Sequence, residues 1–187
     1  MSDTILDYLN NGSAITYFVL ALLSSYFILV VWIFVYKYLS VSSLSQNEKK
    51  SLESLLNRST TVSPLSKLSK CMDNSRYSKE LFNACEISII KDASSGISWL
   101  SIVSSTAPFI GLFGTVVGIL ESFAKFADQQ KVSFAVIAPA ISEALVATAA
   151  GIFVAIFAYT FHQILTRKIY ELNTYLKAQS EILISRG

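Results

Sequence analysis

The chain has 187 residues, and its composition differs from that of soluble domains, because 52% of the residues are hydrophobic and only 15% are charged. The net charge is +2, and no interleaved basic and aromatic patch is present, which argues against nucleic acid as a partner. With one histidine, no metal-spaced His/Cys cluster and no GxxxxGK[ST] loop, we expect neither an enzyme nor a bound metal or cofactor.

The first predicted element is an apolar span at residues 14–36, which follows a short N-terminal segment, residues 1–13. The run from Ile15 to Tyr36 contains no charge and is long enough to cross about 30 Å of hydrocarbon at about 1.5 Å per residue. A secretory signal peptide is the alternative, but no basic residue precedes the run, and the run is too long for a signal core. We therefore predict a retained membrane anchor.

A segment rich in serine and charge follows at residues 37–96, and Pro64 divides it into two portions that each show helical spacing. We expect a small helical bundle there, on the cytoplasmic side. Cys71 and Cys85 lie in this segment, too far apart for a CxxC motif. Because cytoplasmic thiols stay reduced, we expect both cysteines to be buried and unpaired.

The second predicted span, residues 97–122, carries proline and glycine within an apolar run. Small residues recur every three or four positions and form one stripe: Ser104, Ala107, Gly111, Gly114, Gly118 and Ser122. Gly114 and Gly118 form a GxxxG motif, which allows membrane helices to approach closely. Pro108 leaves the carbonyl of Ser104 without its usual helical donor and is expected to bend the span. From this helix alone, a packing face without a role in conduction explains the stripe equally well.

A short connection, residues 123–131, leads to the third predicted span, residues 132–163, in which small residues also repeat: Ala140, Ala144, Ala147, Gly151, Ala155 and Ala158. Glu143 lies beside this face. A charge near the bilayer centre costs about 2.5 to 3.5 kcal/mol on insertion scales, so we expect the carboxylate to face protein or a water-filled cavity. The alternatives are a position near the interface and pairing with a helix end.

Thr115 in the second span and Thr148 in the third add hydroxyls, which can both donate and accept hydrogen bonds, as a polar path for ions or protons requires. Either threonine alone can instead bond back to its own helix. The tail, residues 164–187, continues the third span with an amphipathic stripe: Leu165, Ile169, Leu172 and Leu176. This stripe needs a partner, which is either the middle segment or a neighbouring subunit.

The orientation follows from the basic residues, since cytoplasmic flanks retain positive charge. All but two of the 15 Lys and Arg residues fall in the middle segment or the tail. The N-terminus is therefore predicted to lie outside the cytoplasm and the C-terminus inside. The sequence as a whole predicts an all-α integral membrane protein with three transmembrane helices, the second and third extended, and a small cytoplasmic helical region.

Two segments carry a resemblance to a known family: TAPFIGLFGTVVGIL, residues 106–120, and APAISEALVATAAGIFVAI, residues 138–156. Together with the order of the spans, they resemble the ExbB/TolQ/MotA family of proton-channel subunits, and the leading TAPF favours ExbB over TolQ. Phe157 stands where a proline is often found, and His162-Gln163 stands where Tyr-Asn is common. These departures leave the geometry at the cytoplasmic end open.

The resemblance implies a homopentamer in the bacterial inner membrane, with a periplasmic N-terminus and a dimer of a single-span ExbD-like partner in its pore. That partner carries the critical membrane aspartate. Carried over by motif position, Glu143, Thr115 and Thr148 face the pore and form the proton pathway. The expected helix-packing residues are Pro108, Gly111, Gly114, Gly118, Ala147 and Gly151.

The function that the resemblance implies is energy transduction. An ExbB-like subunit uses the proton motive force to energise a TonB-like protein, which drives outer-membrane uptake of nutrients such as iron-siderophore complexes. A TolQ-like subunit would instead serve envelope maintenance in the Tol-Pal system. A membrane scaffold that assembles through the small-residue faces and conducts nothing is a third hypothesis.

Overall fold

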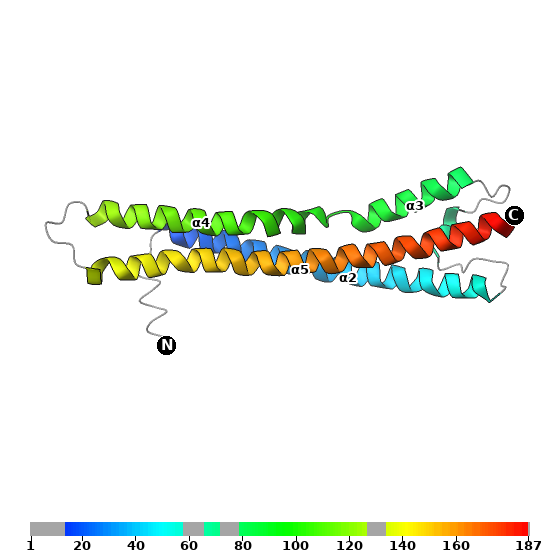
Figure 1. Ribbon diagram of the computed structural model, residues 1–187, viewed down its shortest axis with the longest axis horizontal. Helices are drawn as coiled ribbons and strands as arrows, with labels where there is room; N and C mark the ends of the chain where they lie inside the picture. Colours follow the sequence, from blue (N-terminus) through cyan, green and yellow to red (C-terminus); the bar gives the residue numbers. More distant parts are fainter. Residues whose placement is uncertain (1–13, 58–65, 72–78, 127–133, 187) are drawn as a thin grey trace. The chain divides into compact units, whose positions relative to one another are not determined.

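The computed structural model describes residues 14–57, 66–71, 79–126 and 134–186 (Figure 1). These residues form four α-helices and one short 3-10 helix: α2 at Ala14–Leu56, η1 at Leu68–Cys71, α3 at Lys79–Ser94, α4 at Ser98–Phe126 and α5 at Phe134–Arg186. By length and composition, three stretches of helix could cross a membrane. The predicted all-α fold with three long apolar helices is confirmed for the described residues.

Two of the helices run beyond the predicted spans. The helix that starts with the first span continues to Leu56, and the third span and the tail form the single helix α5. Neither glycine nor proline occurs between Tyr36 and Leu56, or after Gly151 within α5, so nothing in these sequences interrupts the helical hydrogen bonds.

A glycine separates α3 from α4. Gly96 has a positive φ of 81°, a conformation that glycine adopts without the steric cost of a Cβ atom. The amide of Ile97 donates a hydrogen bond of 3.2 Å to the carbonyl of Ser94, the last residue of α3. This arrangement resembles a glycine C-cap, and it ends α3 close to the point where the second span was expected to begin.

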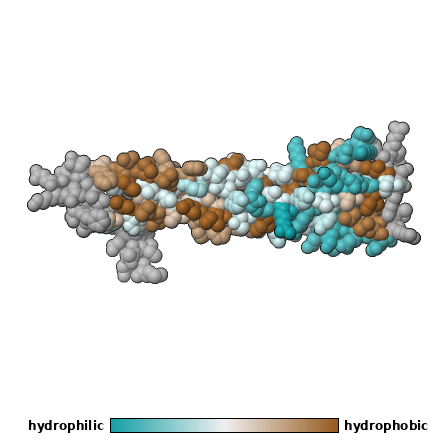
Figure 2. Space-filling view, viewed as in Figure 1, coloured by the Kyte–Doolittle hydropathy of each residue, from teal (hydrophilic) through white to brown (hydrophobic). Residues whose placement is uncertain are grey.

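The chain divides into two compact units, and α2 and α5 contribute residues to both. The first unit comprises Met1–Val31 and Trp99–Thr160. In it, the ring of Phe27 from α2 lies 5.7 Å from that of Phe153 and 5.6 Å from that of Phe157, both in α5. Hydrophobic residues cover most of the visible surface of this unit (Figure 2). Such a large exposed apolar surface is expected of a membrane-spanning unit.

The second unit comprises Trp32–Ser98 and Phe161–Gly187, and hydrophilic residues are prominent on its visible surface (Figure 2). One hydrophobic core holds it together: Val41, Leu55, Leu68, Phe82, Ile89, Ala93, Leu172, Leu176 and Leu183. Leu172 and Leu176 of the tail are completely buried in this core. The amphipathic stripe of the tail therefore packs on the middle segment of its own chain, which decides between the two partners that the sequence left open.

A buried carboxylate joins three segments of the second unit. Glu48 of α2 accepts hydrogen bonds from the Ser66 hydroxyl at 2.6 Å and from the Lys67 amide at 2.7 Å. The side-chain amide of Gln179 in α5 donates to the Glu48 carboxylate at 3.1 Å and to its main-chain carbonyl at 3.0 Å. Ser51 in turn donates to the Gln179 carbonyl oxygen at 3.0 Å. These hydrogen bonds compensate for the removal of Glu48 from water.

The expectation for Cys85 is wrong. Its side chain is half-buried in α3 and takes part in a disulfide bond. The prediction rested on the missing CxxC spacing and on the compartment, whereas the fold brings η1 into contact with α3, which sequence spacing does not reveal. The side chain of Cys71 lies outside the described residues.

Candidate functional site

The candidate site lies where α4 crosses α5 in the first unit. Gly111 of α4 and Gly151 of α5 are both buried. A Cβ atom added to Gly111 would lie 2.6 Å from the carbonyl oxygen of Ala147, and one added to Gly151 would lie 2.6 Å from that of Ala107. Real Cβ atoms essentially never come this close to another heavy atom, so the crossing requires glycine on both helices.

Two hydroxyls meet beside this crossing. The Oγ1 atoms of Thr115 in α4 and Thr148 in α5 lie 2.5 Å apart, and either can be the donor. Thr115 Oγ1 also lies 2.8 Å from the carbonyl oxygen of Ala144 and 3.3 Å from that of Gly111. Thr148 Oγ1 lies 3.3 Å from the same Gly111 carbonyl. The pair is thus surrounded by acceptors.

This geometry allows the two hydroxyls to exchange the roles of hydrogen-bond donor and acceptor. Each hydroxyl has one proton and can accept as well as donate, so the bond between them can run in either direction while the other proton goes to a carbonyl. Thr115 is only 7% exposed and Thr148 is half-buried, so Thr148 is the more accessible member. The pair can relay a change in hydrogen bonding between α4 and α5 without leaving a buried donor unsatisfied.

The remaining glycines of the stripe contact two helices. A Cβ atom on Gly114 would lie 2.9 Å from Val19 Cγ1 in α2 and 3.2 Å from Ala147 Cβ in α5. A Cβ atom on Gly118 would lie 3.3 Å from Thr16 Oγ1 and 3.4 Å from the Cβ atom of Ala144. The small-residue stripe therefore packs α4 against both α2 and α5. Pro108 lies inside α4, which remains one helix across it.

Glu143 lies elsewhere on α5. It precedes Thr148 by five residues, which places the two side chains about 140° apart around an α-helix. Its side chain is partly exposed, although the Oε1 atom is buried. The structure thus brings Thr115 and Thr148 together but does not place Glu143 beside them. That all three face one pore stays a prediction.

One residue of this region was not indicated by the sequence. Thr16, near the start of α2, is 1% exposed and lies against Gly118. A threonine at the start of an otherwise apolar span is a weak signal, because such residues often occur at membrane interfaces. Its packing against the glycine stripe depends on how α2 meets α4, which the sequence does not specify.

No group of three His, Cys, Asp or Glu side chains that could hold a metal ion occurs among the described residues. The donors and acceptors of the site are hydroxyls and main-chain carbonyls. Its chemistry is therefore the making and exchange of hydrogen bonds.

Comparison with known proteins gives matches along the whole chain. A Helicobacter pylori (strain 26695) protein described as ExbB-like 1 is 43% identical over 188 residues, which cover 100% of both chains. The biopolymer transport protein ExbB of Pseudomonas putida is 43% identical over 99 residues, covering 51% of this chain and 30% of that protein. The Tol-Pal system protein TolQ of Pseudomonas aeruginosa is 43% identical over 90 residues, covering 48% of this chain and 34% of that protein.

A family match covers the candidate site itself. The sequence profile of the MotA/TolQ/ExbB proton channel family matches residues 47–178, a range that includes Thr115, Glu143 and Thr148. Members of this family are proton-channel and transport components, and together with the three apolar helices the match points to a bacterial inner membrane. The chain belongs to the MotA/TolQ/ExbB proton channel family.

Proposed function

We propose that this chain is an ExbB-like proton-channel subunit of an inner-membrane motor. With an ExbD-like single-span partner, it uses the proton motive force to energise TonB-dependent uptake of nutrients through the outer membrane. The observation that carries the proposal is the buried hydroxyl pair of Thr115 and Thr148 within the family-matched region. The full-length match to an ExbB-like relative favours ExbB over other members of the family.

In this proposal five copies of the chain form a ring, and α4 and α5 of each copy face a pore that holds the partner. The partner's membrane acid gains and loses the proton. Thr148, the more accessible hydroxyl, hydrogen-bonds to that acid. Thr115, the more buried of the two, orients Thr148 through their shared hydrogen bond. A hydroxyl suits this position because it can donate to a carboxylate and accept from a carboxylic acid.

Glu143 has a different task in this mechanism. A carboxylate in a membrane span is costly to insert, by about 2.5 to 3.5 kcal/mol, so a residue of this kind usually serves function. It lies about 140° around α5 from Thr148, on a different face of the helix. We assign it the tuning of the field and hydration in the pore.

The test is complementation of bacteria that lack ExbB and TolQ activities by this chain, expressed with its own single-span partner and TonB-like protein. Growth on an iron-siderophore source and resistance to detergent are scored side by side. Glu143→Ala is expected to abolish rescue. Glu181→Ala removes an exposed carboxylate from the same helix and is expected to leave rescue intact.

The outcomes separate three functions. Rescue of iron-dependent growth alone establishes the ExbB-like role. Rescue of detergent resistance alone assigns a TolQ-like role. The match to a TolQ protein is the reason for testing this alternative. Rescue of neither, in cells where the complex is assembled, contradicts the proposal and leaves a different load or a nonconducting scaffold. Full activity of a well-expressed Glu143→Ala protein contradicts the role assigned to Glu143.

A further inference from the structure

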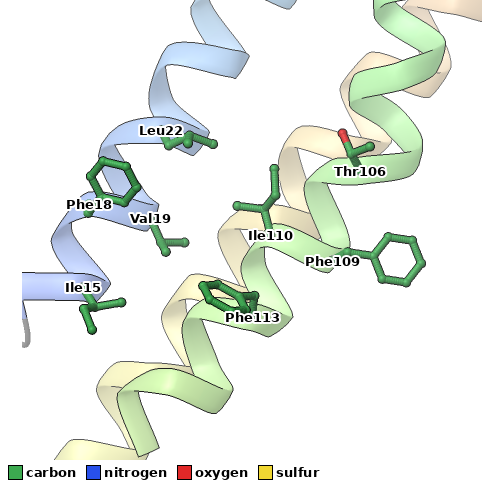
Figure 3. Close-up of a pocket in the computed structure, with 8 residues that line it drawn as sticks. All are labelled: Ile15, Phe18, Val19, Leu22, Thr106, Phe109, Ile110 and Phe113. Carbon is green, nitrogen blue, oxygen red and sulfur yellow. The ribbon is translucent and has the colours of Figure 1, made fainter. Parts of the chain in front are cut away.

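An apolar groove of about 400 Å³ runs between α2 and α4 in the first unit. Phe18, Val19 and Leu22 line it from α2, and Ile110 and Phe113 point into it from α4 (Figure 3). Its volume lies within the range of sites that hold small molecules, about 300 to 1,000 Å³. The groove lies outside the crossing of α4 and α5 that carries the hydroxyl pair.

The side chains that line the groove offer an occupant no free hydrogen-bond donor. Thr106 supplies the one hydroxyl among the lining residues, and it donates to the carbonyl of Ile102, four residues earlier in the same helix, at 2.8 Å. The other lining residues are aliphatic or aromatic. A ligand that fits this groove is therefore a hydrocarbon along its whole buried length, since a polar group there would lose its partners in water.

The groove also differs from the faces on which α4 packs other helices. Helices in membranes associate through small residues that let their backbones approach, and the stripe with Gly111, Gly114 and Gly118 already faces α5 and α2. The groove has large side chains on both walls, and a helix is about 10 to 12 Å wide with its side chains. A single extended hydrocarbon chain is much narrower than a helix and therefore suits a groove of this volume better.

The bilayer around this unit contains such hydrocarbon chains. Phe18 and Phe113 are 68% and 62% exposed, so the groove opens onto the apolar surface by which this membrane-spanning unit meets the bilayer. We propose that one acyl chain of a bilayer phospholipid occupies the groove and fills the gap between α2 and α4. A chain packed on two helices is held more firmly than the surrounding lipid, because it makes contacts on both sides.

The first test measures phospholipid retained by the full-length protein after purification in mild detergent, by native mass spectrometry. Ile110→Trp fills the groove, and Leu112→Trp adds the same bulk to an exposed position on a different face of α4. The wild type and Leu112→Trp are expected to retain about one phospholipid per chain. Ile110→Trp is expected to retain at least about fivefold less. Equal retention in all three proteins would overturn the proposal.

A second measurement does not depend on Ile110→Trp and covers the case in which that variant does not fold. A photoreactive benzoylphenylalanine replaces Phe18 in one protein and Phe123, an exposed residue of α4 outside the groove, in another. Both proteins are irradiated after detergent purification. A phospholipid adduct at position 18 and not at 123 supports the proposal. An adduct to a second copy or to residues 1–13, or equal lipid adducts at both positions, refutes it.

Discussion

The paired hydroxyls of Thr115 and Thr148 make different contributions, although they share one hydrogen bond. Thr115 is almost fully buried and also contacts two carbonyls, so it is mainly a fixed part of the helix interface. Thr148 is half-buried and has one further carbonyl contact. Under the proposed function, this asymmetry favours Thr148 for the contact with the partner's acid and Thr115 for the positioning of the Thr148 hydroxyl.

Replacing Thr148 with Val keeps the side-chain shape but removes the hydroxyl. We expect a loss of about tenfold or more in proton-driven growth, equivalent to about 1.4 kcal/mol of a barrier. Assembly is expected to survive, since hydrogen bonds between membrane helices contribute only about 0.6 to 2 kcal/mol. Growth rate and complex size by gel filtration are the measurements, and Thr148→Ser, which restores a hydroxyl, is the control. Loss of assembly in Thr148→Val alone would indicate a packing role.

The Glu48 carboxylate, in contrast, has a structural role. Glu48→Ala would leave the Ser66 hydroxyl and the Lys67 amide without their acceptor, and the Gln179 amide would keep only its bond to the main-chain carbonyl of residue 48. We expect the free energy of unfolding to fall by about 3 kcal/mol or more, since each buried unsatisfied group costs about 1 to 3 kcal/mol.

Thermal unfolding of the purified protein measures this effect. The control is Glu53→Ala, which removes an exposed carboxylate of α2 whose pair with Lys49 is 4.0 Å long and contributes at most about 0.5 kcal/mol. Equal destabilisation by the two substitutions would contradict the structural role of Glu48.

In the packing of α4 against its neighbouring helices, the glycines differ in the space around them. We therefore predict that alanine substitutions at these glycines destabilise the protein to different extents. Gly111→Ala would push a methyl group to 2.6 Å from a main-chain carbonyl, which cannot move aside like the end of a side chain. We expect a destabilisation of about 1 to 3 kcal/mol, as for other overpacked interfaces, seen as a lower melting temperature.

Gly118→Ala is the matched comparison, because its new methyl group meets its nearest neighbours at 3.3 and 3.4 Å. A shift of a few tenths of an ångström accommodates it, so the melting temperature should change little. A Gly118→Ala protein less stable than Gly111→Ala would contradict this ranking of the two positions.

For the whole molecule, the distribution of basic residues predicts the orientation in the membrane. A fluorescent protein fused after Gly187 is expected to fold and fluoresce in the cytoplasm, whereas a cysteine in place of Ser2 should react with a membrane-impermeant maleimide from outside. The same cysteine placed at exposed Ser185 is the control and should stay unlabelled until the membrane is opened. Labelling of Ser185→Cys in intact spheroplasts would show that the orientation is opposite to the predicted one.

The sequence predicted the helices well because long charge-free runs have few alternatives in a bilayer. It also indicated the glycine stripe, whose spacing reflects close packing. It could not predict that the hydroxyls of Thr115 and Thr148 meet, since that depends on where α4 lies against α5. The Glu48 network was missed for a similar reason: its partners are far apart in sequence, and Ser66 and Gln179 resemble ordinary surface residues until the bundle folds.

The reciprocal contacts of Gly111 and Gly151 have a mechanical consequence. Gly111 of α4 has a hydrogen atom where a side chain would meet the carbonyl of Ala147 in α5, and Gly151 of α5 has one where a side chain would meet the carbonyl of Ala107 in α4. Each backbone therefore packs directly against the other. Sliding α4 along α5 by one position would drive a side chain into a main-chain oxygen. We therefore expect the two helices to move together as one rigid unit. In the proposed ring, motion during proton transfer would then occur between subunits or in the partner that they enclose.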